Sequence, residues 1–93
     1  MPKKAKQDVW GALADGTRRE ILLLLISRPH TAGELADQFE LTAATVSHHL
    51  AVLRECGLVL FERRAQTLIY SLDTEGFEEA SAYLKLFARG RRK

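Results

Sequence analysis

The fold is decided by residues 31–57, which read TAGELADQFELTAATVSHHLAVLRECG. Thr31 and Glu34 have the spacing of a capping box, in which a hydroxyl and a carboxylate satisfy two orphan backbone amides. This spacing predicts a helix that begins at Thr31. A second helix is expected to begin at Thr42, whose hydroxyl can cap it. Only two residues follow Phe39 before this cap, and so short a connection is typical of two helices that cross at a steep angle.

The second of these helices has two distinct faces. Val46, Leu50 and Leu53 recur at helical spacing and are expected to be buried. At about 100° per residue, the opposite side is slim and hydrogen-bonding; it consists of Ala44, Ser47, His48 and Ala51, with Thr45 on its flank. Such a face can enter a DNA major groove, where hydroxyls and imidazoles bond to base edges and methyls touch thymine. The alternative is that Ser47 and His48 are ordinary solvated residues on a core helix.

Two further helices are expected before this pair. Apolar spacing predicts the first over residues 9–14 and the second over residues 18–27. Asp15 or Thr17 can cap the second helix. Its apolar run Ile21–Ile26 is typical of a central helix that packs on several sides.

After Gly57, a helix stop signal, the apolar period changes from helical to strand-like. Leu58–Leu72 is predicted to be a β-hairpin with Arg63–Thr67 at its tip. A last helix follows Asp73, and it carries more apolar surface than packing on so small a domain requires. We therefore expect a homodimer interface between the first and last helices, formed by Val9, Trp10, Leu13, Phe77, Tyr83, Leu84 and Phe87.

Together these elements predict a mainly α (α+β) fold. The expected order is α-α-α-α-β-β-α, a winged helix-turn-helix with about five helices and a two-stranded β-hairpin wing. One domain is expected over residues 1–93, with an ordered body over 8–88 and basic tails at 1–7 and 89–93.

Three segments in this order resemble the ArsR family of bacterial repressors. They are Leu13–Leu22 (LADGTRREIL), Thr45–Leu50 (TVSHHL) and Leu53–Val59 (LRECGLV). The resemblance extends from Val9 to about Phe87. Gly16 stands where the family usually has proline, and the wing tip lacks the family's common glycine. The resemblance implies a winged-helix repressor that binds DNA.

Charge is unevenly distributed along the chain. The net charge is only +2, yet residues 7–88 carry seven Lys or Arg against twelve Asp or Glu. Half of the basic residues lie in the two tails, and Arg63 and Arg64 form a basic pair at the expected wing tip, so a polyanion would meet the extremities of the molecule. The predicted DNA-binding residues are Thr42, Ala44, Thr45, Ser47, His48, Arg63 and Arg64. Arg18 and Arg19 could complement phosphates or pair with nearby acids.

An enzyme is not expected. A chain of 93 residues is too short to bury a deep substrate cavity. Ser47 and His48 are helix neighbours that point about 100° apart, so they do not form a nucleophile and base. His49, at the edge of the apolar face, is expected to be a hydrogen-bonded core residue. The single cysteine, Cys56, and the absence of a signal peptide favour a cytoplasmic protein without disulfides.

No cofactor or metal ion is expected. The histidines and Cys56 do not converge in the predicted fold. The resemblance implies that metal-sensing relatives use cysteines in the third helix or histidines in the last, but the third-helix positions hold Thr31, Gly33 and Ala36, and the last helix has no histidine. The chain is therefore most similar to the metal-independent, SdpR-like autorepressors of that family.

We interpret the chain as a sequence-specific transcriptional repressor that binds an inverted-repeat operator as a homodimer and silences its own operon. Two alternatives stay open at this point. One is a family sensor of a non-metal signal, such as oxidation of Cys56. The other is a winged-helix protein-interaction module that does not bind DNA.

Overall fold

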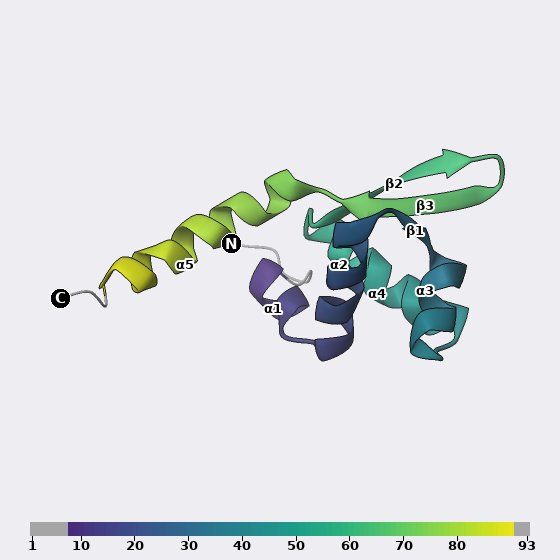
Figure 1. The fold of residues 1–93 in the computed structure, drawn as a ribbon, viewed down its shortest axis with the longest axis horizontal. Helices are drawn as coiled ribbons and strands as arrows, with labels where there is room; N and C mark the ends of the chain where they lie inside the picture. Colours follow the sequence, from purple (N-terminus) through teal and green to yellow (C-terminus); the bar gives the residue numbers. More distant parts are fainter. Residues whose placement is uncertain (1–7, 91–93) are drawn as a thin grey trace, which may run out of the picture.

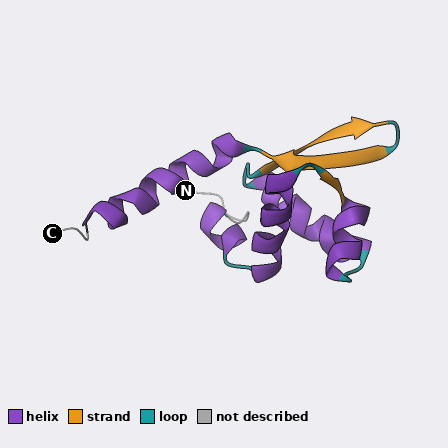
Figure 2. Ribbon diagram, in the orientation of Figure 1, coloured by secondary structure: helices purple, strands orange, loops and turns teal. Residues whose placement is uncertain are grey.

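The computed structural model describes residues 8–90, so the tail segments 1–7 and 91–93 lie outside it. It is a winged helix with a helical body, a β-sheet and a projecting last helix (Figures 1 and 2). The elements are α1 (Val9–Leu13), α2 (Gly16–Ser27), β1 (His30–Thr31), α3 (Ala32–Phe39), α4 (Ala43–Glu55), β2 (Val59–Arg64), β3 (Thr67–Leu72), the 3-10 turn η1 (Thr74–Phe77) and α5 (Glu78–Gly90). The predicted fold class is confirmed.

The helix starts follow the predicted capping chemistry. The Thr31 hydroxyl accepts a hydrogen bond from the Glu34 amide at 3.1 Å, and the Glu34 carboxylate accepts one from the Thr31 amide at 2.9 Å. Of the two caps considered for α2, Asp15 is the one used: it accepts from the Arg18 amide at 3.0 Å, while Thr17 lies inside the helix. That backbone amide lowers the pKa of the Asp15 carboxyl.

The sheet has a third strand that the sequence analysis did not predict. The order is β1-β3-β2, with both neighbouring pairs antiparallel, and β1 pairs His30 with Tyr70 and Thr31 with Ile69. A strand of two residues is too short to show an alternating pattern. The His30 side chain is buried, and its Nδ1 lies 2.9 Å from the Arg28 carbonyl oxygen. The short strand therefore fastens the wing to the start of α3.

One hydrophobic core joins α2, α3 and α4 to the base of the wing. Its largest fully buried side chains are Ile21, Leu35, Val46, Leu50, Leu53 and Leu58. The expectation that α2 packs on several sides is wrong for one face, because Leu23 and Ile26 are exposed. The rest of the run meets the core: Ile21, Leu22 and Leu25 are buried in it, and Leu24 packs against it partly buried.

The last helix projects away from the body, and the molecule measures 52 × 35 × 23 Å (Figure 1). It begins after the η1 turn, which Asp73 caps by accepting from the Glu75 amide at 3.3 Å. It continues to Gly90, so the expected body limit of residue 88 is too short, and Arg89 belongs to the helix rather than to a tail. None of the helices within residues 8–90 has the length and apolar character needed to cross a bilayer.

Candidate nucleic-acid interface

The turn between α3 and α4 brings the two helices into the predicted helix-turn-helix. Glu40 adopts a left-handed conformation (φ 58°), and its amide donates to carbonyls in the last turn of α3. The Leu41 amide donates to the Ala36 carbonyl at 3.0 Å, which closes the turn. Thr42 then caps α4, because its hydroxyl accepts from the Thr45 amide at 3.1 Å. Two residues are therefore enough to reverse the chain and start a new helix.

The α4 outer face consists of Ala44, Thr45, Ser47, His48 and Ala51, and all five are exposed. Val46, Leu50 and Leu53, on the other side of the helix, are completely buried. The predicted division of this helix into a core face and a slim polar face is confirmed. Contact between the outer face and DNA stays a prediction.

The hydroxyl of Thr45 is oriented by its neighbour. The Thr42 hydroxyl donates to the Thr45 hydroxyl oxygen at 3.0 Å. The Thr45 oxygen accepts this proton and keeps its own proton for a further hydrogen bond. The cap of α4 thus orients one hydroxyl of the α4 outer face.

His49 lies on the inner side of α4 and is half-buried. Its Nδ1 atom is 3.2 Å from Nη1 of Arg18, and since a guanidinium only donates, Nδ1 must accept. Burial lowers the pKa of His49, with a smaller contribution from the Arg18 and His48 charges, while Asp15 acts in the opposite direction. The expected hydrogen-bonded core role of His49 is confirmed, and the ring is neutral near pH 7.

Arg18 and Arg19 act within the fold. Arg18 is buried, and its Nε donates to the Ala12 carbonyl at 2.9 Å. Arg19 donates to the Leu13 carbonyl at 2.7 Å. The suggestion that they complement phosphates is therefore wrong for Arg18, whose guanidinium is buried and bonded to the end of α1. The other suggestion, a nearby acid, agrees with the Arg18 charge, which contributes to lowering the pKa of Asp15. The missed signal was the short first helix, whose last carbonyls need donors from outside it.

The wing separates its two arginines. In the β2–β3 register Phe61 pairs with Tyr70 and Arg63 with Leu68, so Arg63 shares the sheet face of these rings. Arg64 lies on the other face, where its Nε is 3.3 Å from the Glu62 carboxylate. Ala65 makes the turn with φ 59°, the left-handed conformation usually supplied by glycine. The two arginines predicted together at the wing tip thus lie on opposite faces of the sheet, and the charge of Arg64 is paired with that of Glu62.

Arg54 is a basic residue for which the sequence predicted no role. It lies in the last turn of α4, and its guanidinium carbon is 4.6 Å from the centroid of the Phe61 ring. This cation–π contact joins the end of α4 to the wing on the sheet face that carries Arg63. No sequence pattern indicated it, because Phe61 reaches Arg54 only when the hairpin folds back along α4.

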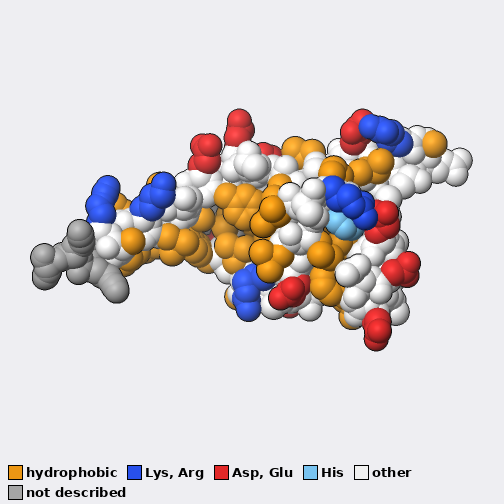
Figure 3. Space-filling view, in the orientation of Figure 1, with side chains coloured by type: hydrophobic (Ala, Val, Ile, Leu, Met, Phe, Trp, Pro, Cys, Tyr) orange, Lys and Arg blue, Asp and Glu red, His pale blue; other side chains and the backbone are white. Residues whose placement is uncertain are grey.

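The first and last helices share an exposed aromatic surface. Trp10 and Tyr83 have ring centroids 5.6 Å apart, and Tyr83 and Phe87 are 5.1 Å apart. Exposed fractions of 43% for Trp10, 55% for Leu84 and 60% for Phe87 are large for such side chains. We call Trp10, Tyr83, Leu84 and Phe87 the α1/α5 face; apolar side chains gather here below α5 in Figure 3. Val9, Leu13 and Phe77, predicted in the same interface, are partly buried against the protein's own core.

Metal and redox chemistry find little support in the residues described. Within residues 8–90, no three of the His, Cys, Asp and Glu side chains lie close enough together to hold an ion. That DNA binding needs no metal stays a prediction. Cys56 is half-buried, and burial raises the pKa of its thiol, which disfavours the reactive thiolate.

Comparison with known proteins sets this geometry in a family. Residues 15–60, from the cap of α2 to the start of the wing, match the family model "Bacterial regulatory protein, arsR family". The transcriptional repressor SdpR of Bacillus subtilis is 34% identical over 80 residues, which are 86% of this chain and 89% of SdpR. The chain belongs to the ArsR family. The resemblance drawn from the sequence is confirmed, and an ArsR-family regulatory protein is not an enzyme.

Two further proteins are also similar to it. The transcriptional activator HlyU of Vibrio cholerae is 37% identical over 78 residues, 84% of this chain and 69% of HlyU. The solution structure of Mb0332 from Mycobacterium bovis, described as a homodimeric winged helix-turn-helix DNA-binding domain, has a TM-score of 0.68 and 28% identity. The match covers 84% of this ArsR-family chain and 72% of that domain.

Proposed function

We propose that this ArsR-family protein binds an inverted-repeat DNA operator as a homodimer and represses its own operon in the cytoplasm. The observation that carries the proposal is the α4 outer face. It presents only methyl, hydroxyl and imidazole groups, all five of its residues are exposed, and the wing follows directly after the same helix. A slim face of this kind fits the major groove, while the wing reaches the adjacent backbone or minor groove.

The homodimer is supported by the α1/α5 face. Monomeric proteins rarely expose a contiguous aromatic patch of this kind. A two-fold dimer through this face would cover it on both subunits and set two α4 helices against one duplex, which requires a two-fold symmetric site. Mb0332 is described as a homodimer, which agrees with this arrangement.

Repression, rather than activation, is proposed from the relative SdpR. SdpR is named a repressor and this chain matches 89% of its length, whereas it matches 69% of the activator HlyU. The described residues offer no three-ligand metal group. Control by occupancy of the promoter alone is the simplest mechanism for such a chain.

Variants of the α4 outer face and of the wing should separate sequence reading from charge attraction. Ser47→Ala and His48→Ala are each expected to weaken binding to the protein's own promoter by about 1–3 kcal/mol and to leave binding to random duplex unchanged, because each removes a hydrogen bond to a base edge. Arg63→Ala should weaken binding to both duplexes and reduce the salt slope by about 0.9, because it removes a phosphate contact. Fluorescence anisotropy over a range of salt concentrations measures both quantities.

Arg64→Ala is the matched control for Arg63→Ala. Both arginines are exposed at the wing tip, but Arg64 is paired with Glu62 and lies on the other sheet face. It is expected to change the salt slope less than Arg63→Ala does. If His48→Ala weakened binding to random DNA as much as binding to the promoter, as Arg63→Ala is expected to do, the assigned roles would be refuted.

A further inference from the structure

The guanidinium of Arg18 connects three helices. It is carried by α2, and it donates to the carbonyls of Ala12 at 2.9 Å and Gly11 at 3.4 Å in α1. It also donates to Nδ1 of His49 in α4 at 3.2 Å. Arg18 is buried; its bond to Ala12 is buried too, and those to Gly11 and His49 are partly buried. Arg18 therefore joins α1, the helix of Trp10, to α4, the helix of the predicted DNA contacts.

Helix α1 depends on donors from outside itself. It has only five residues, and a helix so short is not stable alone. Arg18 supplies donors to Gly11 and Ala12, and Arg19 supplies one to Leu13. The position of α1 is thus fixed by arginines of α2, and Arg18 alone of these also reaches α4.

We propose that Arg18 is a positioning residue that couples α1, at the dimer surface, to α4, at the DNA surface, and that the coupling requires a neutral His49. The part of this inference that concerns DNA rests on the function proposed above. A neutral imidazole offers Nδ1 as an acceptor, whereas an imidazolium has no acceptor and places a second positive charge against the guanidinium. Protonation of His49 should break the hydrogen bond between Arg18 and α4, and it should also weaken the hold of Arg18 on α1.

The pH at which this release occurs follows from the groups around His49. Asp15 and Arg18 face it from the start of α2, and His48 adjoins it on α4. Arg18 also affects the Cys56 thiol: burial raises the pKa of this thiol most, the charge of Asp8 at the cap of α1 raises it further, and the charge of Arg18 lowers it. Burial outweighs the attraction of Asp15, so the pKa of His49 lies below its usual value of 6.5. The contact is intact at pH 7.5 and is lost as the pH falls through that lowered pKa.

Trp10 makes this coupling measurable without DNA. It is the single tryptophan of the chain, it lies on α1, and its ring contacts Tyr83. We expect its fluorescence in the full-length protein to show a transition with a midpoint below pH 6.5. His49→Asn should abolish that transition, because the amide oxygen replaces Nδ1 as acceptor and does not titrate. The matched control His48→Asn, on the neighbouring residue, should retain it.

Promoter DNA provides the second readout. Between pH 7.5 and pH 5.5 the wild type is expected to lose about five- to tenfold more promoter affinity than His49→Asn loses. A Trp10 transition that persists in His49→Asn, or none in the wild type, would overturn the coupling. If the Trp10 transition behaved as expected but the wild type and His49→Asn lost equal promoter affinity between pH 7.5 and pH 5.5, the coupling would not extend to DNA binding. Failure of the wild type to bind its promoter at pH 7.5 would instead refute the proposed function, and the Trp10 titration would still decide the coupling.

Discussion

Gly76→Ala is expected to lower the free energy of unfolding by about 3 kcal/mol, at the upper end of what overpacking usually costs. A methyl group at Gly76 would collide with the carbonyl oxygen of Gly57 and would lie 2.6 Å from its carbonyl carbon. Both partners are backbone, and the Asp73 amide fastens the two segments by donating to the Leu58 carbonyl at 2.9 Å. Neither segment can move without disturbing the base of the wing. Urea unfolding followed by circular dichroism measures the change.

Two other glycines provide graded controls. Gly57 has φ 81° with open space around its α-carbon, so Gly57→Ala should cost only the strain of a left-handed residue, about 1–2 kcal/mol. Gly33 lies within α3, where a methyl would meet only the Thr31 hydroxyl at an ordinary 3.8 Å. Gly33→Ala should be neutral or stabilise by up to about 1 kcal/mol. If all three variants had the same free energy of unfolding, this would contradict the close packing of η1 against the end of α4.

Leu84→Glu is expected to convert the homodimer to a monomer and to remove tight promoter binding. Leu84 is 55% exposed, and α5 projects from the body (Figure 1), so the substitution leaves the core intact. A leucine buried in the interface contributes about 1.5–3 kcal/mol, and two-fold symmetry counts each substitution twice. The dimer dissociation constant should therefore rise by roughly 10² to 10⁴. Sedimentation equilibrium measures it directly.

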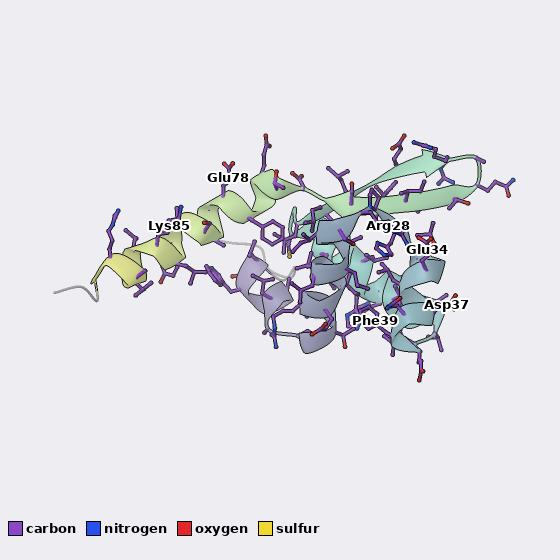
Figure 4. The ribbon with its side chains drawn as sticks, in the orientation of Figure 1. Arg28, Glu34, Asp37, Phe39, Glu78 and Lys85 are labelled. Carbon is purple, nitrogen blue, oxygen red and sulfur yellow. The ribbon has the colours of Figure 1, made fainter. Side chains whose placement is uncertain are left out.

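The matched control adds the same charge to the other side of the helix. Glu78 and Lys85 lie on the side of α5 that faces away from α1 (Figure 4), and helical spacing places Ala82 on that side too. Ala82→Glu should leave both the dimer and promoter binding unchanged. Should Leu84→Glu remain dimeric, or Ala82→Glu dissociate as well, the α1/α5 face would not be the interface.

The sequence was most informative where a local pattern has one structural solution. The Thr31 and Glu34 capping box, the Thr42 cap and the apolar spacing of α4 each predicted what the structure shows. These features involve residues within one or two turns of each other, so tertiary contacts did not alter them. They were also sufficient to orient the α4 outer face, which is the centre of the candidate site.

The features that the sequence did not predict all depend on distant neighbours. Arg18 binds Ala12 and His49, residues that only the folded helix packing brings to it. The strand β1 exists only because β3 lies beside it, and the different settings of Arg63 and Arg64 follow from the hairpin register. Exposure of Leu23 and Ile26 was missed because a continuous apolar run does not reveal which side meets the core.

Footprinting of the purified protein on the DNA around its own gene tests the central claim most directly. The α4 outer face and the α1/α5 face together predict two protected half-sites related by two-fold symmetry, with centres about one helical turn or a multiple of it apart on one side of the duplex. Protection should appear at concentrations well below those that coat random DNA. Protection without two-fold symmetry, or none below the concentration of general coating, would contradict a dimer that reads an inverted repeat.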